Sequence, residues 1–221
     1  MRTYPVHFTV APPGRFTPAQ LLVRLIAFIG LGMLGLSFGT LFSLAYVALP
    51  AYAAARLASL GSTEAYRRDD GPRVQALLRW IAAVSAWVGL VVDRLPARSP
   101  AELVALTLDA EPPARHTASS ALLRIVTGLP SALVLMVLCT IGIFVWLWAA
   151  LSILLSEQVG PLAHQYLIGL QRWSVSLHAY QACLLDEYPP FSFVDGPAEA
   201  AGSQEVASSV SAAGSAYMRP E

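Results

Sequence analysis

The chain repeats its own sequence at two fixed spacings. A shift of 100 residues places Pro12, Pro13, Arg15, Thr17, Leu22, Arg24 and Thr40 on identical residues. A shift of 93 does the same for Leu77, Arg79, Trp80, Ala86, Asp93, Pro96 and Ser99. The sequence therefore predicts a tandem duplication, with one membrane repeat over residues 1–100 and a second over residues 101–195.

Each repeat contains a long apolar run without a charge. There are 31 uncharged residues between Arg24 and Arg56, and 32 between Arg124 and Glu157. A bilayer core of roughly 30 Å requires about 20 helical residues. We therefore expect a mainly α-helical integral membrane protein with transmembrane helices at about 25–55 and 125–156. The first run is too long, and too far from the start, for a signal peptide, so we expect a retained anchor.

Composition agrees with a membrane protein and argues against other classes. Hydrophobic residues make up 56% of the chain and charged residues 13%, about half the charged share of soluble domains. The net charge is zero, so we expect no nucleic-acid partner. The two cysteines, Cys139 and Cys183, have no metal-binding spacing, and we interpret them as small buried hydrophobic residues.

Short strands and amphipathic helices flank the apolar runs. Alternating segments at Tyr4–Val10 and Leu103–Asp109 precede Pro-Pro pairs and predict two strands. Thr17 and Thr117 have the residue type of helix N-caps. Helical periodicity over roughly 72–93 and 161–186 predicts an amphipathic helix in each repeat, lying in the membrane interface or crossing the bilayer.

The number of crossings stays open at this stage. One crossing per repeat would invert the repeats and place the strands on opposite faces, whereas two would allow the strands to pair. Four crossings put eight arginines on the side of the termini and four on the other. The positive-inside rule would then place both termini in the cytoplasm.

Small and aromatic residues suggest further membrane features. Gly35 and Gly39, and also Gly128 and Ala132, have the four-residue spacing of helix-pairing faces, although glycine is common in membrane helices in any case. Trp146 and Trp148 fit an interfacial aromatic belt. We expect the Ala-, Ser- and Gly-rich tail, residues 196–221, to be disordered.

An Arg-Trp…Asp…Pro pattern occurs in both repeats and suggests a symmetric contact. If the amphipathic helices lay antiparallel, Arg79 would approach Asp186 and Arg172 would approach Asp93. In the alternative interpretation, which we favour, Arg and Trp are interfacial anchors and each Asp is a solvated helix end.

The second repeat ends in a more specific motif. Leu170-Gln171-Arg172-Trp173, His178-Ala179-Tyr180 and the segment from Leu184 to Ser192 resemble a bacterial membrane family, the domain of unknown function 4389. Tyr4-Pro5-Val6 and Arg15 also fit, so that the resemblance extends over most of 4–193. The first repeat departs from the motif, with Asp93-Arg94-Leu95-Pro96-Ala97 at the equivalent place. The resemblance implies a bacterial inner-membrane protein of unassigned function and supplies no catalytic residues.

We expect a multi-pass inner-membrane protein without a cofactor or metal, acting as a non-catalytic accessory or scaffold subunit. Its expected partners are the lipid bilayer and a membrane protein or further copies of itself. A small oligomeric transporter or channel is one alternative, and a membrane enzyme on lipid substrates is another. The candidate interaction or structural residues are Arg79, Trp80, Asp93, Arg172, Trp173, His178, Tyr180, Asp186, Glu187, Tyr188, Pro189, Pro190 and Phe191.

Overall fold

The fold is mainly helical, with one two-stranded ribbon. The structure is a computed structural model that describes residues 5–11, 13–33, 38–96, 100–108 and 115–189. In chain order the elements are β1 (Val6–Val10), α1 (Pro18–Met33), α2 (Phe38–Leu60), α3 (Thr63–Asp69), α4 (Gly71–Val88), α5 (Pro100–Leu103), β2 (Val104–Leu108), α6 (Ala118–Thr127), α7 (Leu129–Ser156) and α8 (Pro161–Gln181).

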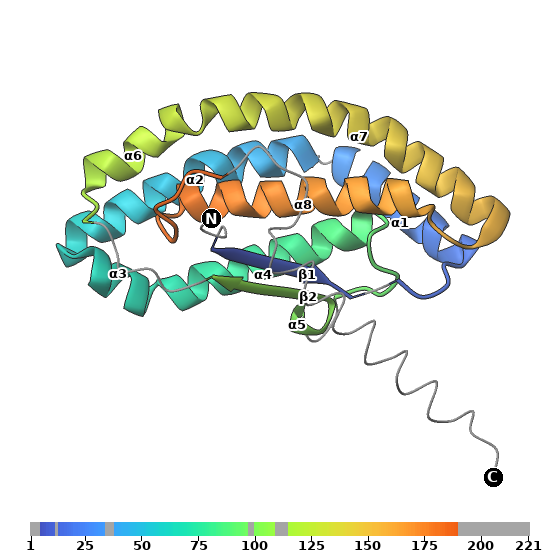
Figure 1. Cartoon of the computed structure of the whole chain (residues 1–221), viewed down its shortest axis with the longest axis horizontal. Coiled ribbons are helices and arrows are strands. Elements are labelled where there is room, and N and C mark those ends of the chain that lie inside the picture. Colours follow the sequence, from blue (N-terminus) through green and yellow to red (C-terminus); the bar gives the residue numbers. More distant parts are fainter. Residues whose placement is uncertain (1–4, 12, 34–37, 97–99, 109–114, 190–221) are drawn as a thin grey trace, which may run out of the picture.

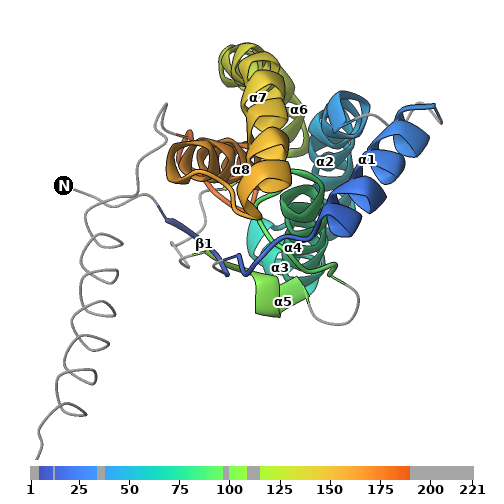
Figure 2. The ribbon, with the colours of Figure 1, turned by 90° about the vertical axis from the view of Figure 1, so that its right-hand side faces the viewer.

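The elements stack in three layers along one long axis (Figure 1). We call α1, α2, α6 and α7 the outer layer. Figure 2 shows α6 and α7 in line, α1 and α2 beside them, and α4 and α8 between this layer and the ribbon. Helices α4 and α8 run in opposite directions and contact each other. The core therefore lies between the ribbon, the α4–α8 pair and the outer layer.

The ribbon pairs one strand from residues 1–100 with one strand from residues 101–195. Strands β1 and β2 pair antiparallel, with Phe8 opposite Leu106 at the centre. Both central side chains are fully buried beneath the α4–α8 pair. The two predicted strands are confirmed, and an arrangement with the strands on opposite faces is wrong because they lie side by side.

The apolar runs form more than one helix each. The first run, predicted as one helix at about 25–55, is divided between α1 and α2, on either side of residues 34–37. The second begins earlier than 125, at the capping box of Thr117, and changes helix at Gly128. Pro130 occupies the first turn of α7, where its missing N–H costs least. In the first repeat, Thr17 and Gln20 exchange the equivalent capping bonds.

Helices α4 and α8 are shorter than the sequence predicts. We expected them to reach Asp93 and Asp186, but they end at Val88 and Gln181. Just past each end, Leu90 and Cys183 have φ values of 61° and 56°. Such a left-handed residue closes the last turn and stops the helix. The two aspartates therefore lie beyond the helices, in the segments that follow them.

The outer layer exposes apolar side chains to its surroundings. Two described helices, Gly39–Leu60 and Leu129–Ser156, are long and apolar enough to cross a membrane, by length and composition. In their most apolar stretches only 33% and 17% of residues are buried. Large exposed hydrophobic residues on α7 include Leu133, Met136, Val137, Ile143, Phe144, Leu147, Trp148, Leu151, Leu154 and Leu155.

The predicted pairing and belt residues differ in their environments. A Cβ atom on Gly128 would lie 2.3 Å from Gln181 Nε2, so this glycine allows a close helix contact. Gly39 faces open space, and Gly35 lies outside the described residues, as does the 196–221 tail. Trp148 is 65% exposed. Trp146 is half-buried and donates to the Val88 carbonyl at 3.0 Å.

Candidate interaction site at the end of the second repeat

A buried arginine from the first helix of each repeat holds the end of that repeat's last helix. In the first repeat, Arg24 is fully buried, and its Nη2 donates to the carbonyls of Val92 and Asp93, both at 2.8 Å. Its guanidinium lies 5.0 Å from the centre of the Phe16 ring and 5.3 Å from that of Trp87. A cation is favourable at this position, because helix C-termini leave carbonyl groups without partners.

Arg124 makes the corresponding contacts in the second repeat. Its Nη1 donates to the carbonyls of Tyr180 and Leu185, and its guanidinium lies 4.3 Å from the Tyr180 ring centre. Arg124 matches Arg24 at the shift of 100, and Tyr180 and Leu185 match Trp87 and Val92 at the shift of 93. Residues paired by the sequence repeat thus make paired contacts.

Asp186 is the centre of a charged cluster, and among the described residues the matching Asp93 has an ion pair only with Arg94. Asp186 Oδ1 accepts from Arg67 Nη2 at 2.7 Å, contacts His116 Nε2, and lies 3.5 Å from Arg124 Nη2. Burial, together with the neighbouring Arg124 and Arg67, keeps the pKa of His116 below its ordinary value, although Asp186 acts in the opposite direction. We therefore treat His116 as neutral near pH 7, with Nε2–H donating to the Asp186 carboxylate.

Helix α3 completes the hold on the end of α8. Tyr66 is fully buried and donates to the Ala182 carbonyl at 2.8 Å, and Arg67 Nε donates to the Cys183 carbonyl at 3.1 Å. Burial raises the pKa of the Tyr66 hydroxyl, so that it stays protonated as a donor. The end of α8 is therefore held by side chains from two helices. Helix α3 belongs to the first repeat, and α6 belongs to the second.

Arg79 and Arg172 bind the ribbon rather than the aspartates. Arg79 Nη2 donates to the Leu106 carbonyl at 3.1 Å, and Arg172 Nη2 to the Phe8 carbonyl at 3.4 Å. These carbonyls belong to the central pair of the ribbon. The less favoured hypothesis, a pairing of Arg79 with Asp186, is wrong, because Arg79 binds the ribbon while Asp186 lies beyond the end of α8.

The remaining predicted residues do not share one site. Trp80 is 52% exposed, whereas Trp173 is buried. Asp93 lies 3.8 Å from the exposed Arg94, and Glu187 is exposed. Pro189 is buried, and Pro190 and Phe191 lie outside the described residues.

Two tyrosines of the motif pack beside the arginine cluster. The rings of Tyr180 and Tyr188 meet edge to face, with centres 5.5 Å apart. The Tyr180 hydroxyl lies 3.0 Å from the Thr127 hydroxyl, and the Tyr188 hydroxyl accepts from the Ser131 amide at 3.1 Å. Tyr180 thus connects the end of α8 to α6, and Tyr188 connects the segment after α8 to α7.

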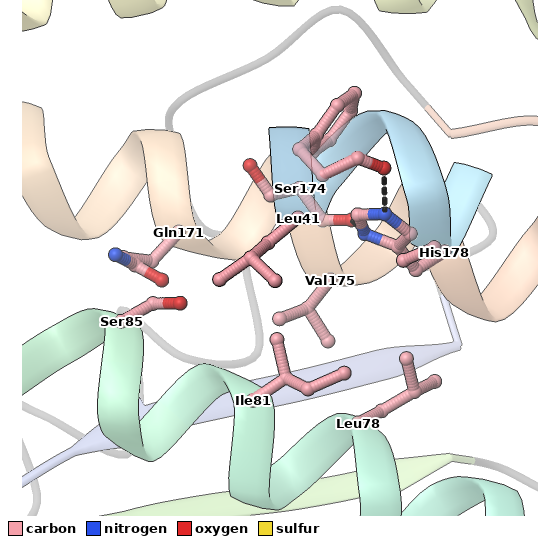
Figure 3. Close-up of a pocket in the computed structure, with 10 residues that line it drawn as sticks. Leu41, Leu78, Ile81, Ser85, Gln171, Ser174, Val175 and His178 are labelled. Carbon is pink, nitrogen blue, oxygen red and sulfur yellow. Dashed lines mark hydrogen bonds between the residues drawn. The ribbon is translucent and has the colours of Figure 1, made fainter. Parts of the chain in front are cut away.

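His178 lines a separate small cavity between α2, α4 and α8 (Figure 3). The cavity has a volume of about 40 Å³, and its polar lining groups are Ser85, Gln171, Ser174 and His178. His178 Nδ1 donates to the Ser174 carbonyl at 2.7 Å, and its ring lies edge-on to Phe42. His178 and Asp186 share no partner, so the structure does not bring together the residues of an acid–base site.

Sequence reasoning missed Arg67, His116 and Arg124. A shared role for Arg124 and Arg24 could have been predicted, because the two arginines coincide at the shift of 100 residues. His116 matches Phe16 at the same shift. The replacement of a phenylalanine by a titratable histidine could have indicated a polar contact at this position. Arg67 gave no such signal, since it lies in the charged segment between two helices and has no counterpart in the repeat.

The contacts of this arrangement are ion pairs and hydrogen bonds that hold the end of α8. The described residues contain no group of three or more His, Cys, Asp or Glu that could hold a metal ion. Burial raises the pKa of the Cys183 thiol, which disfavours the reactive thiolate. Arginine and carboxylate partners in the cluster are already bound to one another.

Comparison with known proteins identifies part of the second repeat. Residues 118–192 match the family described as Domain of unknown function (DUF4389). The match spans α6, α7, α8 and the motif after α8, and the predicted resemblance is confirmed over this range. No curated protein and no solved structure matches the chain.

Proposed function

We propose that this protein is an integral protein of the bacterial inner membrane and acts as a non-catalytic accessory or scaffold subunit. In this proposal the outer layer contacts lipid, and the rest of the molecule is held rigid for a membrane-protein partner or a further copy of the chain. The observation that carries the proposal is the exposure of α7.

Helix α7 has 28 residues and no charged side chain, yet only 17% of its most apolar stretch is buried. The core helix of a soluble protein would be mostly buried. Exposed apolar surface on this scale is unfavourable in water and marks a membrane or protein contact. Lipid accounts for the exposed side of α7 without any further assumption.

Tandem duplication is the second part of the proposal. Three matched features support it: the capping bonds at Thr17 and Thr117, the arginine contacts of Arg24 and Arg124, and the left-handed residues at Leu90 and Cys183. Each pair is related by a shift of 100 or 93 residues, the same spacings as in the sequence.

The two alternative functions have weaker support. A transporter needs a path, and the cavity beside His178 has room for only a few water molecules at about 40 Å³. A lipid enzyme would need His178, Asp186 and Glu187 at one site, but His178 and Asp186 have different surroundings.

Two measurements test the proposal. First, alkaline carbonate should leave the protein in the membrane pellet, and release into the supernatant would contradict membrane integration. Second, purification of the tagged chain in mild detergent should recover a stoichiometric membrane-protein partner or a homo-oligomer. A chain that is always monomeric and alone would contradict the scaffold role. Unchanged cellular lipids in the Asp186→Asn and His178→Gln variants would argue against the enzyme alternative.

A further inference from the structure

The outer layer is much longer than a bilayer is thick. The ten residues of α6, Gly128 and the 28 residues of α7 form an arch that runs along the long axis (Figure 1). At about 1.5 Å per residue the arch is about 58 Å long, measured along the helices, whereas the hydrocarbon core is roughly 30 Å thick. If this pair of helices crossed the bilayer upright, one end would project far into water.

The exposed side chains are apolar at both ends of this length. Leu123 on α6 is 57% exposed and Leu155 at the end of α7 is 80% exposed. The one charged residue of the two helices, Arg124, is turned inward and is 6% exposed. Helix α1 repeats the pattern, with Arg24 buried and Ile26 61% exposed. Apolar surroundings are therefore favoured along α1, α6 and α7.

The ribbon lies on the opposite side of the molecule, below the middle of the outer layer (Figure 1). Within the part of the chain that the structure describes, the two strands pair only with each other, so each has an edge without a strand partner there, and Thr9 and Thr107 are exposed. Upright helices would hold this ribbon at the mid-depth of the bilayer. Unpaired strand edges are not tolerated in contact with lipid.

Charged side chains on the ribbon side agree with an aqueous environment there. Arg68 on α3 is 72% exposed and Arg73 in the first turn of α4 is 82% exposed. Both helices lie on the ribbon side of the outer layer in Figure 1. The exposed side chains are therefore apolar on the outer layer and charged on the ribbon side of the molecule.

We infer that α1, α2, α6 and α7 lie flat in one leaflet of the membrane, with the ribbon and α3 in water on the same side. A helix with its side chains is about 10–12 Å across, which fits within half of a bilayer core of roughly 30 Å. The inference rests on the proposed membrane integration, and it replaces the membrane crossings expected from the sequence with insertion from one side.

Site-directed cysteine labelling tests the orientation. In a Cys139→Ala background, where Cys183 is fully buried, single cysteines replace the exposed Ser119, Thr107 and Ser156. An impermeant maleimide is added to spheroplasts and to inside-out vesicles. All three cysteines should react in one of the two preparations and stay unreacted in the other. A cysteine at Met136→Cys, on α7, where the methionine is 61% exposed, should stay unreacted in both.

Three results would overturn the inference, and they are distinguishable from one another. Reaction of Ser119→Cys and Ser156→Cys from opposite sides would show that the outer layer crosses the membrane. Protection of Thr107→Cys in both preparations would place the ribbon in lipid. Reaction of Met136→Cys from water would show that no leaflet covers α7. Release of the protein by carbonate would instead contradict the proposed function itself.

Discussion

Each buried arginine donates hydrogen bonds to carbonyls at the end of a helix, in place of water. Substitution of these arginines should therefore lower the stability of the fold strongly. We predict that Arg24→Met destabilises the protein by about 2–4 kcal/mol, because two buried carbonyls lose their donor. In detergent this corresponds to a fall in melting temperature of roughly 5–15 °C. Arg94→Met removes an arginine that is 82% exposed and should change the melting temperature little. Equal effects of the two variants would contradict the assigned role.

The charged cluster should make stability depend on pH. The pKa of His116 is lowered in the folded protein, mainly by burial, so the unfolded chain takes up a proton near pH 6.5 while the folded protein does not. Acidification below about pH 6.5 therefore favours unfolding, by at most about 1.4 kcal/mol per pH unit for this group. His178 is buried and its pKa is also lowered, so it contributes with the same sign.

The His116→Phe variant isolates the contribution of His116. Phenylalanine is the residue at the matching position of the first repeat, Phe16, where it packs against Arg24. Melting temperatures of the variant between pH 7.5 and 5.5 should fall less steeply than those of the unchanged protein. A parallel pair of curves would show that His116 does not titrate between these limits.

At the scale of elements, close helix contacts depend on one glycine in particular. A Cβ on Gly128 would lie 2.9 Å from the Arg124 carbonyl oxygen, in addition to its clash with Gln181. We predict that Gly128→Ala costs about 1–3 kcal/mol, because the α6–α7 joint must shift. Gly39→Ala is the matched control, since a Cβ there meets nothing within 4 Å. It should be neutral or slightly stabilising in the same thermal assay.

Helix positions were predictable where a local signal existed. The strands, the threonine caps and the helical conformation of the segments at 72–93 and 161–186 follow from residue type and periodicity. The amphipathic, interfacial character predicted for the second of these segments is wrong, because most of α8 is buried in the core. The ends of α4 and α8 did not follow, because Leu90 and Cys183 adopt left-handed backbone that neither residue type favours. Their conformation is fixed by tertiary contacts, including the arginines that hold the following carbonyls.

At the scale of the whole molecule, the sequence predicted two related units but not how they combine. The ribbon contains one strand from each repeat, α4 packs on α8, and α2 packs along α6. The Asp186 cluster likewise needs Arg67 from the first repeat. The periodicity of a sequence predicts helices and strands, but it does not predict which distant segments contact one another. For this reason the candidate site could be predicted only in part.

These contacts predict that the two repeats do not fold separately. Expressed alone, residues 1–100 lack the partner of β1, and residues 101–221 lack the α2 surface that covers α6. Each half exposes core residues such as Phe8 and Leu106, so we expect neither to accumulate in membranes. Co-expressed with different affinity tags, the halves should purify together in equal amounts, since the break after residue 100 removes only the first residue of the short helix α5 and leaves the other helices and both strands intact. A monodisperse half obtained alone would show that each repeat is an independent domain, and that the shared ribbon is not required for folding.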